Sequence, residues 1–277
     1  MTKILGISAF YHDSAVALIV DGKISYAAQE ERFSRLKHDS NFPQLALKNL
    51  LEHTNTSLSD IDYVVFFEKP FLKFERLIET YLAFSPLGIQ QFLKSMPIWL
   101  KEKLFMKKMI VNHLKKFNEK FNEKKLFFSE HHLSHSASAF FPSPFKKSVI
   151  FTADGVGEWA TTSLAIGEGN KITTIKEIFF PNSIGLLYSA FTYYIGFKVN
   201  SGEYKLMGLA PYGKPIYSRI IKESLIDIKA DGSFRLNQKY FNYSTGFKMT
   251  NNNFNKLFGE KPRSPETKIK KFHMDIA

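Results

Sequence analysis

The stretch GISAFYHDSAVALIVDGKI, residues 6–24, decides the fold because a second stretch matches it, FTADGVGEWATTSLAIGEGNKI, residues 151–172. Each runs through an apolar strand, a polar turn with an aspartate, a second strand, a hairpin with a glycine and a third strand. A helix with an apolar face is predicted after each stretch, at residues 42–54 and 183–197. The chain is therefore predicted to contain an internal repeat of a βββα unit.

The elements around the repeat follow from the same patterns. Asp21-Gly22 predicts a type I′ hairpin turn, which needs positive φ at both central residues. Residues 71–121 are predicted to be mostly helical, with breaks near Pro86 and Pro97, and the glycines and prolines of residues 200–215 indicate tight turns. Strands are predicted at residues 3–8, 15–20, 23–29, 62–68, 125–130, 148–158, 161–169 and 171–180.

The predicted fold class is α/β. A duplicated βββαβαβα unit is the layout of the actin-like superfamily (ASKHA), which includes sugar kinases and Hsp70-like ATPases, and this step is a fold analogy that gives no function by itself. The first lobe is predicted at residues 1–146 and a partial second lobe at residues 147–277, because the second unit lacks the later strands and helices. The chain is therefore expected to be a fragment or a truncated gene product.

Composition narrows the function classes. The chain has no cysteine, which excludes disulfides, thiolate metal sites and a cysteine nucleophile and fits a cytoplasmic location. No apolar run reaches the roughly 18 residues that a membrane span needs, so membrane insertion is not expected. The net charge is +12, with many lysines in residues 101–125. That stretch fits an anionic partner or a lysine-rich surface helix; scarce arginine favours the surface helix, and a nucleic-acid partner is not favoured.

Three histidines stand close together at residues 131–135. His131 and His135 are at i and i+4, which on a helix places their Cβ atoms about 5–6 Å apart on one face. Two imidazoles at this spacing can bind one metal ion; a pair of partly buried, hydrogen-bonded histidines is the alternative. His132 stands where a zinc protease has its glutamate, so the pattern does not indicate that activity, and His132 itself is not a predicted ligand.

Two polar turns occupy matching positions of the repeat. His12 and Asp13 follow the first strand and are candidate substrate-binding residues. A histidine there could act as a general base or orient an acceptor hydroxyl, and Asp13 could hold a metal-bound water; the alternative is that Asp13 caps the turn and His12 is incidental. Asp154, Gly155 and Gly157 follow the strand at 148–158. Glycines let backbone N–H groups turn toward phosphate oxygens, and Asp154 could orient a magnesium ion or a ribose hydroxyl.

Two charged segments complete the candidates. Lys37, after the third strand, could contact a phosphate or a carboxylate, or lie in a solvated loop. Glu203 and Lys205 lie in the segment at 200–215, and a loop with this many glycines and prolines is more often functional than not.

Together these segments resemble the O-carbamoyltransferase family of the nodulation and antibiotic-tailoring type. The resemblance covers most of residues 1–215 and the final residues. The matching stretches are FYHDSAVALIVDGKISYAAQEERFSRLKHD, EHHLSHSASAFFPSPF, TADGVGEWATTSLAIGEG, SIGLLYSAFTYYIGFKVNSGEYKLMGLAPYGKP and HMDIA.

The resemblance implies transfer of a carbamoyl group from carbamoyl phosphate, through a carbamoyl-adenylate made with ATP, to a hydroxyl of a sugar-like or other small acceptor. It implies that His131 and His135 bind a divalent metal, iron in the family, against the nucleotide phosphate. Asp154 would contact the adenylate, Lys37 its carbamoyl-phosphate end, and His12 the acceptor. Glu203 and Lys205 would be acceptor or supporting contacts.

Two features that the family has are not found in this sequence. The family's third metal ligand is an aspartate that would fall after residue 277, as would the adenylate-forming domain, so a missing C-terminal domain or a complementing chain is an expected partner. The isolated chain is expected to be inactive in the overall reaction. Two alternatives remain, a non-catalytic remnant that binds nucleotide or a partner chain, and a relative of the tRNA threonylcarbamoyl-transfer proteins.

Overall fold

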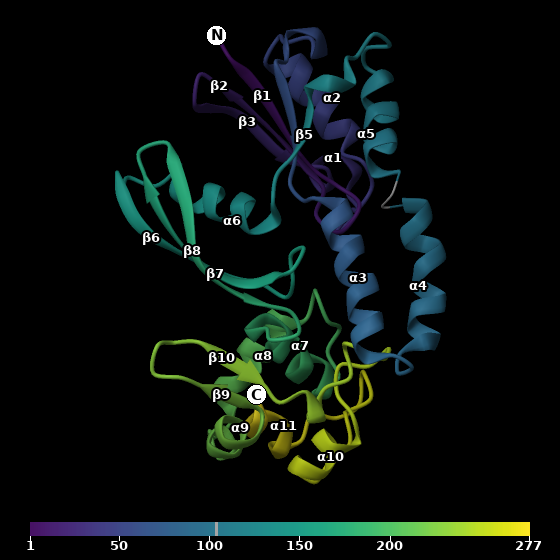
Figure 1. Ribbon diagram of the computed structural model, residues 1–277, viewed down its shortest axis with the longest axis vertical. Coiled ribbons are helices and arrows are strands. Elements are labelled where there is room, and N and C mark those ends of the chain that lie inside the picture. The colour runs from purple at the N-terminus through teal and green to yellow at the C-terminus, as the bar shows by residue number, and fades with distance from the viewer. Residues whose placement is uncertain (103–104) are drawn as a thin grey trace. The chain divides into compact units, whose positions relative to one another are not determined.

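The computed structural model describes residues 1–102 and 105–277, which form a mixed α/β structure (Figure 1). Contacts group the chain into two compact units, residues 1–74 with 97–134 and residues 75–96 with 135–277. The division points fall inside helices α3 (Pro70–Phe84), α4 (Ile89–Glu102) and α6 (His131–Phe140). This grouping differs from the predicted ranges 1–146 and 147–277 in residues 75–96 and 135–146.

The first unit is built on a five-stranded mixed sheet with the order β3-β2-β1-β4-β5. Its first three strands pair antiparallel, whereas β4 and β5 run parallel to β1. Asp21 and Gly22 have φ of 48° and 78°, as the predicted type I′ turn requires. The elements are β1 (Lys3–Ser8), β2 (Ala15–Val20), β3 (Lys23–Gln29), α1 (Glu31–Ser34), α2 (Gln44–His53), β4 (Tyr63–Phe66), α5 (Met106–Lys115) and β5 (Leu126–Phe128).

Helices α2 and α5 lie on one side of this sheet (Figure 1). Leu18 of the sheet, Leu47 of α2 and Ile110 of α5 are fully buried in one core, so their apolar area supplies the main stabilisation of the unit. Glu30 is also buried, and its carboxylate accepts hydrogen bonds from the backbone N–H groups of Leu45 (2.9 Å) and Ala46 (2.7 Å) at the start of α2. This carboxylate satisfies donors that the first helical turn leaves unpaired.

The basic stretch at 101–125 is a packing element of this unit. Helix α5 buries Met106, Ile110, Val111 and Leu114, while Lys107 and Lys108 are exposed. The surface-helix interpretation is consistent with this arrangement. Leu104, an apolar residue of the same basic stretch, lies outside the described residues. Pro97 stands inside α4 and does not break it, so the predicted break there is wrong.

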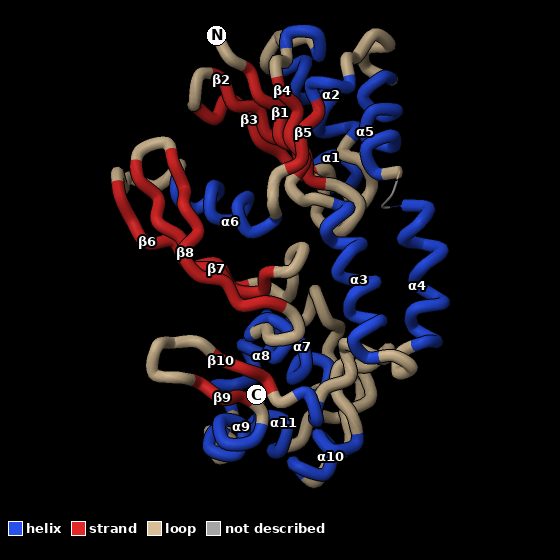
Figure 2. The backbone as a smooth tube through the Cα atoms, in the orientation of Figure 1, coloured by secondary structure: helices blue, strands red, loops and turns tan. Residues whose placement is uncertain are grey.

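The second unit opens with a three-stranded antiparallel sheet in the order β6-β7-β8, followed by helix α7 (Figure 2). The repeated order of three antiparallel strands and then a helix is thus present in both units. Phe140 of α6 packs against Ile150 and Ala165 of the sheet. The elements are β6 (Lys147–Ala153), β7 (Ala160–Glu168), β8 (Lys171–Phe179) and α7 (Ile184–Tyr194).

The rest of the second unit is a helical subcore around α7. Tyr194 and Phe254 are buried in it and lie edge to face, with ring centroids 4.8 Å apart. The segment at 200–215, predicted as tight turns, instead holds helix α8 and a 3₁₀ helix at Ala210–Tyr212. The elements are α8 (Glu203–Leu209), α9 (Ser218–Ser224), β9 (Ile226–Ile228), β10 (Phe234–Leu236), α10 (Asn252–Phe258) and α11 (Lys271–Ile276).

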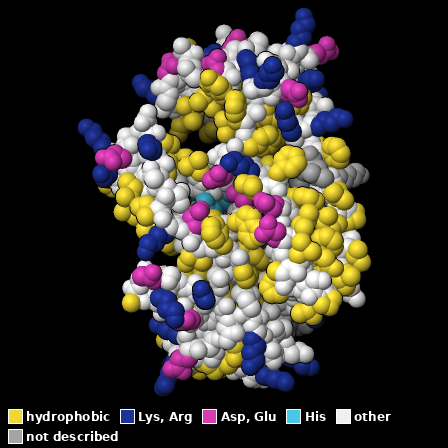
Figure 3. Space-filling model, in the orientation of Figure 1, with side chains coloured by type: hydrophobic (Ala, Val, Ile, Leu, Met, Phe, Trp, Pro, Cys, Tyr) yellow, Lys and Arg dark blue, Asp and Glu magenta, His cyan; other side chains and the backbone are white. Residues whose placement is uncertain are grey.

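Two surface properties bear on function. Hydrophobic side chains gather over α3 and α4 (Figure 3), where Leu82, Leu87 and Leu93 are each more than 60% exposed. In residues 1–102 and 105–277, each helix is too short or too polar to cross a bilayer.

Candidate functional site

Helix α6 and the loop after β6 bring together two histidines and a carboxylate. Nε2 of His135 lies 3.8 Å from Oδ2 of Asp154, a contact within the second unit. His131 is one turn earlier in the same continuous helix, so helix geometry fixes its place beside His135. One potential ligand atom from each of the three residues lies within 4.8 Å of the others. His132 is not in this group and is only 5% exposed.

The Asp154 carboxylate is oriented by its own turn. Its Oδ1 accepts a hydrogen bond from the backbone N–H of Gly155 at 2.6 Å, which leaves Oδ2 toward His135. A carboxylate fixed in this way loses less freedom when it binds a ligand. The sequence had assigned Asp154 to the adenylate and the metal carboxylate to a residue after 277. The structure places the Asp154 carboxylate beside the two histidines.

The loop that carries Asp154 is held mainly through its backbone. The Ser183 hydroxyl lies 2.9 Å from the carbonyl oxygen of Asp154 and 2.7 Å from that of Gly155, and it caps α7 by accepting from Leu186 N–H. Gly185 packs so closely that a Cβ there would lie 2.5 Å from the Asp154 carbonyl carbon. Helix α7 therefore sets the position of the loop.

Arg76 supports the same loop from α3. This side chain is 9% exposed, and its Nη1 donates to the carbonyl oxygen of Gly157 at 2.6 Å. Its guanidinium also lies 5.5 Å from the centroid of the Phe180 ring. Sequence reasoning missed Arg76 and Ser183, because neither belongs to a local motif and both act on a loop far away in the chain.

The turn after β1 carries a different arrangement, a carboxylate between two imidazoles. Asp13 Oδ2 lies 2.8 Å from His12 Nδ1, and Asp13 Oδ1 lies 2.9 Å from His38 Nδ1. Burial alone would raise the pKa of Asp13, but the hydrogen bonds and charges of His38 and His12 outweigh burial and hold that pKa below 3.8. Because an ionised carboxylate only accepts hydrogen bonds, the Nδ1 atom of each ring carries the hydrogen in these two contacts.

Backbone hydrogen bonds tie this turn to the segment that contains His38. Phe10 N–H donates to Ser40 and Ser14 N–H donates to Asp39, at 2.8 Å and 2.9 Å. Asp13 and His38 both have positive φ, at 48° and 57°, a region that costs a residue with a Cβ roughly 1–2 kcal/mol. The surrounding contacts hold two residues in an unfavourable backbone conformation, which is common at functional sites.

The remaining predicted residues lie in dissimilar surroundings. Lys37 is exposed, next to His38, which the sequence reasoning passed over although it stands in the same charged segment. Lys205 is exposed on α8. The Glu203 carboxylate accepts hydrogen bonds from Ser189 Oγ (3.0 Å), Asn200 N–H (3.0 Å) and Gly202 N–H (3.1 Å). These bonds give Glu203 a clear role in fixing the start of α8.

The comparisons with known proteins agree with the resemblance in the sequence. Residues 3–277 match the family model described as carbamoyltransferase N-terminus. The chain belongs to this family. Its whole length is 57% identical to the uncharacterized protein sll1178 of Synechocystis, of which it covers 45%. Over 83% of its length it is 33% identical to the nodulation protein NolNO of Sinorhizobium fredii, of which it covers 32%.

The chain thus spans less than half the length of these curated relatives. Among solved structures it is similar to YeaZ from Pseudomonas aeruginosa, with 11% identity and a TM-score of 0.32 over 66% of this chain and 68% of that one. A likeness at that TM-score carries no argument about fold or activity.

Proposed function

We propose that this chain carries part of the active site of an O-carbamoyltransferase. The reaction moves a carbamoyl group from a carbamoyl-adenylate, made from carbamoyl phosphate and ATP, to a hydroxyl of a sugar-like or other small molecule. Membership of the carbamoyltransferase family supports the reaction class. The observation that carries the proposal is the group of His131, His135 and Asp154, whose potential ligand atoms lie within 4.8 Å of one another.

The donor set fits a divalent metal. Two imidazoles with one carboxylate are the ligands that suit Fe²⁺ sites with open positions, and iron is the metal we propose, with magnesium as a further candidate at Asp154. A cation bound there would offset negative charge on the phosphate of the departing nucleotide. The Gly155 N–H bond holds Asp154 ready for this role. That N–H group is thereby used, and the Gly157 N–H group donates to the Ala160 carbonyl oxygen, so the expected turn of both groups toward phosphate oxygens is not what the structure has.

His12 is the proposed proton acceptor. Asp13 binds its Nδ1–H, so Nε2 is the basic atom of the neutral ring. The acceptor oxygen bonds to the carbamoyl carbon, the bond from that carbon to the phosphate oxygen breaks, and AMP leaves with the electron pair. The hydroxyl proton passes to Nε2 of His12. His38 is a positioning residue, because it binds the other oxygen of Asp13.

Two lysines and the fold complete the proposal. Lys37 would neutralise charge at the carbamoyl-phosphate end of the adenylate, since it is exposed beside the His12–Asp13–His38 group. Lys205 is proposed as an acceptor contact, and Glu203 as its support through α8. The repeat of three antiparallel strands and a helix in both units supports an actin-like arrangement.

Metal binding tests the observation that carries the proposal. We expect the chain to bind Fe²⁺ under anaerobic conditions in a titration calorimeter, with one site. His135→Ala and Asp154→Asn should each weaken the affinity by about 100-fold, because each removes one of three ligands. His53→Ala, at an exposed histidine of α2, is the matched control and should change nothing. Unchanged Fe²⁺ affinity in both ligand variants would remove the basis of the proposal.

A further inference from the structure

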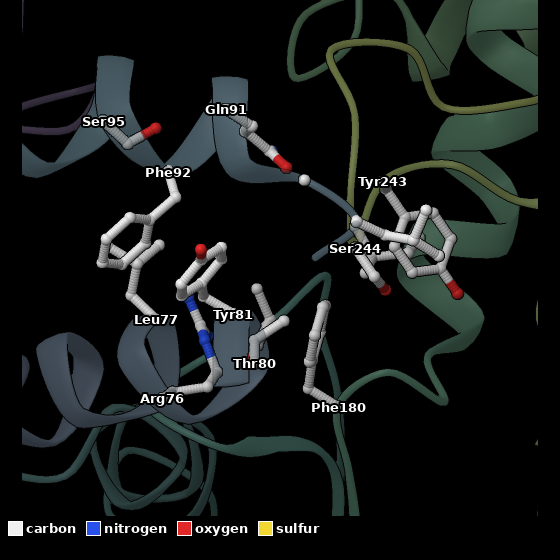
Figure 4. Close-up of a pocket in the computed structure, with 14 residues that line it drawn as sticks. Arg76, Leu77, Thr80, Tyr81, Gln91, Phe92, Ser95, Phe180, Tyr243 and Ser244 are labelled. Carbon is white, nitrogen blue, oxygen red and sulfur yellow. The ribbon is translucent and has the colours of Figure 1, made fainter. Parts of the chain in front are cut away.

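Two pockets of the second unit differ in the side chains that line them. The first has a volume of about 230 Å³, and its lining includes the rings of Tyr81, Phe92 and Phe180 (Figure 4). The second, the α7 pocket, has a volume of about 690 Å³ and lies among the end of α7, the segment at 242–251, α10 and the segment at 261–265. This larger volume falls in the range of about 300 to 1,000 Å³ that small-molecule sites have.

The lining of the α7 pocket carries positive charge. Lys248, Lys261 and Arg263 all line it, and the described lining contains neither aspartate nor glutamate. Within residues 1–102 and 105–277, neither of these two lysines forms a salt bridge. Because no carboxylate of the lining offsets the three cations, the pocket attracts anions and disfavours cationic ligands.

The fold fixes the arginine of this pocket. The backbone N–H of Arg263 donates to the Tyr194 carbonyl oxygen at 2.9 Å, and its Nε donates to the Ile195 carbonyl oxygen at 2.5 Å. Its guanidinium lies 5.4 Å from the centroid of the Phe197 ring. Gly196 has a φ of 80°, and a Cβ there would lie 2.5 Å from the Arg263 carbonyl oxygen. A cation held in this way loses little freedom when a ligand binds.

Polar side chains of the same lining have atoms that the fold does not use. Thr250 is only 3% exposed, and among the described residues its hydroxyl has no hydrogen-bond partner. The Tyr193 hydroxyl makes no hydrogen bond within this part of the chain either. Burial raises the pKa of Tyr193 above 10.0, so the phenol keeps its proton and can donate. The Asn255 amide has an unpaired Oδ1 and can present its nitrogen instead after a flip. Buried polar atoms are normally paired, so these groups indicate a polar ligand.

The α7 pocket is separate from the loop that carries Asp154. Ser183 binds that loop at the start of α7, whereas the pocket lies at the end of the helix and beyond it. The helix has 11 residues, which at 1.5 Å per residue places its two ends about 16 Å apart. A small ligand in the α7 pocket would therefore not contact Asp154.

We propose that the α7 pocket binds a small phosphate-type anion with at least two negative charges. Such an anion has several acceptor oxygens around each phosphorus atom, so it can accept from Tyr193, Thr250 and Arg263 together. Lys248 and Lys261, which are exposed, would add attraction at the mouth of the pocket. The inference is independent of the proposed function, because none of these residues belongs to the metal group or to the turn after β1.

Titration calorimetry of the metal-free chain tests the proposal with two probes at equal ionic strength, inorganic pyrophosphate and acetate. We expect pyrophosphate to bind at a single site and acetate to give no measurable binding. The double variant Lys248→Gln with Lys261→Gln should lower pyrophosphate affinity about tenfold, because it removes two of the three charges. Lys256→Gln, at an exposed lysine of α10 outside the lining, is the matched control and should change nothing.

Thr250→Val separates binding from folding, because it removes the hydroxyl and keeps the shape of the side chain. Pyrophosphate affinity should fall about fivefold, since one donor to the anion is lost. The midpoint of urea unfolding without ligand should not fall, because the hydroxyl has no partner among the described residues. Lower stability with unchanged affinity would make Thr250 a purely structural residue and would count against the proposal.

Asp154→Asn distinguishes the α7 pocket from the candidate metal site and should leave pyrophosphate affinity unchanged. Loss of affinity in that variant, with none in the lysine variant, would assign the anion to the metal site and overturn the proposal. Absence of pyrophosphate binding, or equal binding of acetate, would overturn it as well. A single-stranded oligoribonucleotide that bound more tightly than pyrophosphate, and lost affinity in the lysine variant, would assign this surface to RNA and not to a small anion.

Discussion

The turn after β1 and the turn after β6 occupy the same position in the repeat and are held in opposite ways. The first is held by side chains that can ionise, with Asp13 between His12 and His38, in addition to its backbone hydrogen bonds to residues 39 and 40. The second is held through its backbone, with Ser183 on two carbonyl oxygens, Arg76 on a third and Gly185 packed against the chain. The strands of the two units follow the same order, whereas the turns after β1 and β6 are stabilised by different kinds of side chain.

This difference suggests a division of labour. In the first turn the side chains are partly exposed and bear the basic nitrogen atoms, so it suits proton transfer. In the second turn the backbone is locked and a single carboxylate is aimed at the histidines of α6, so it suits ligand binding. A locked backbone lowers the entropy cost of holding a ligand in one geometry.

The largest effect is expected in the first turn. His12→Ala should lower the rate of carbamoyl transfer about 100-fold or more, because it removes the proposed proton acceptor. The assay would follow labelled carbamoyl phosphate with ATP and a hydroxyl acceptor, using the protein that the complete gene encodes. His38→Gln should cost less, because glutamine can still donate to Asp13.

The two first-turn variants should also differ in how they respond to pH. The His12 variant should lose the dependence of rate on a single basic group, while His38→Gln should keep the dependence and shift its midpoint. Fe²⁺ affinity should stay unchanged in both, since neither residue belongs to the metal group. Full activity in His12→Ala would assign proton transfer to another residue.

A smaller effect, on stability, is expected in the second turn. Gly185→Ala should destabilise the fold by about 1–3 kcal/mol, since the new Cβ would lie 2.5 Å from the Asp154 carbonyl carbon. Gly155→Ala is the matched control, because its Cβ would meet nothing nearer than 3.9 Å. Urea unfolding measures both. Equal destabilisation would mean that close packing on α7 does not fix the loop.

The strands and the positions of the two turns were predictable from the sequence. The first three strands have the predicted bounds, and the matched polar turns follow the expected strands, because apolar alternation and an Asp-Gly turn are local signals. Helix α8 was missed for a physical reason. The Gly202 to Gly213 segment is rich in turn residues, but the Glu203 carboxylate binds the N–H groups of Asn200 and Gly202 and so permits a helix start there.

The group of His131, His135 and Asp154 was less predictable than the strands and turns. The spacing of His131 and His135 is a local signal, but the approach of Asp154 depends on how α6 packs against the β6-β7-β8 sheet. Arg76 reaches Gly157 across 81 positions of the chain, and no pattern within one segment reveals such a contact. His38 stood in a segment already singled out, and its role emerged only with the hydrogen bond to Asp13.

The smallest expected effect is a difference in acid sensitivity between the two turns. The pKa of Asp13 is lowered in the fold, so its contribution to stability is complete above 3.8 and is lost as pH falls through the lower, folded value. Protonation of Asp13 would weaken its hydrogen bonds to the two imidazoles. The nearby backbone hydrogen bond from Ser14 N–H to the Asp39 carbonyl oxygen would then open more often. The backbone hydrogen bonds from Asp154 N–H to the Thr161 carbonyl oxygen and from Gly157 N–H to the Ala160 carbonyl oxygen involve no titrating group. Their strength should therefore not change with pH.

Amide hydrogen exchange measures this difference directly. As pH falls from 5.5 to about 2.5, the protection factor of Ser14 N–H should fall, with the fall confined to pH below 3.8, while those of Asp154 and Gly157 should stay nearly constant. Asp13→Asn should lower Ser14 protection at pH 5.5 and make it insensitive to pH. A parallel fall at both turns would point to acid unfolding of the whole chain. The first turn would then owe no special stability to its ionised carboxylate, and the contrast between side-chain and backbone anchoring would not hold.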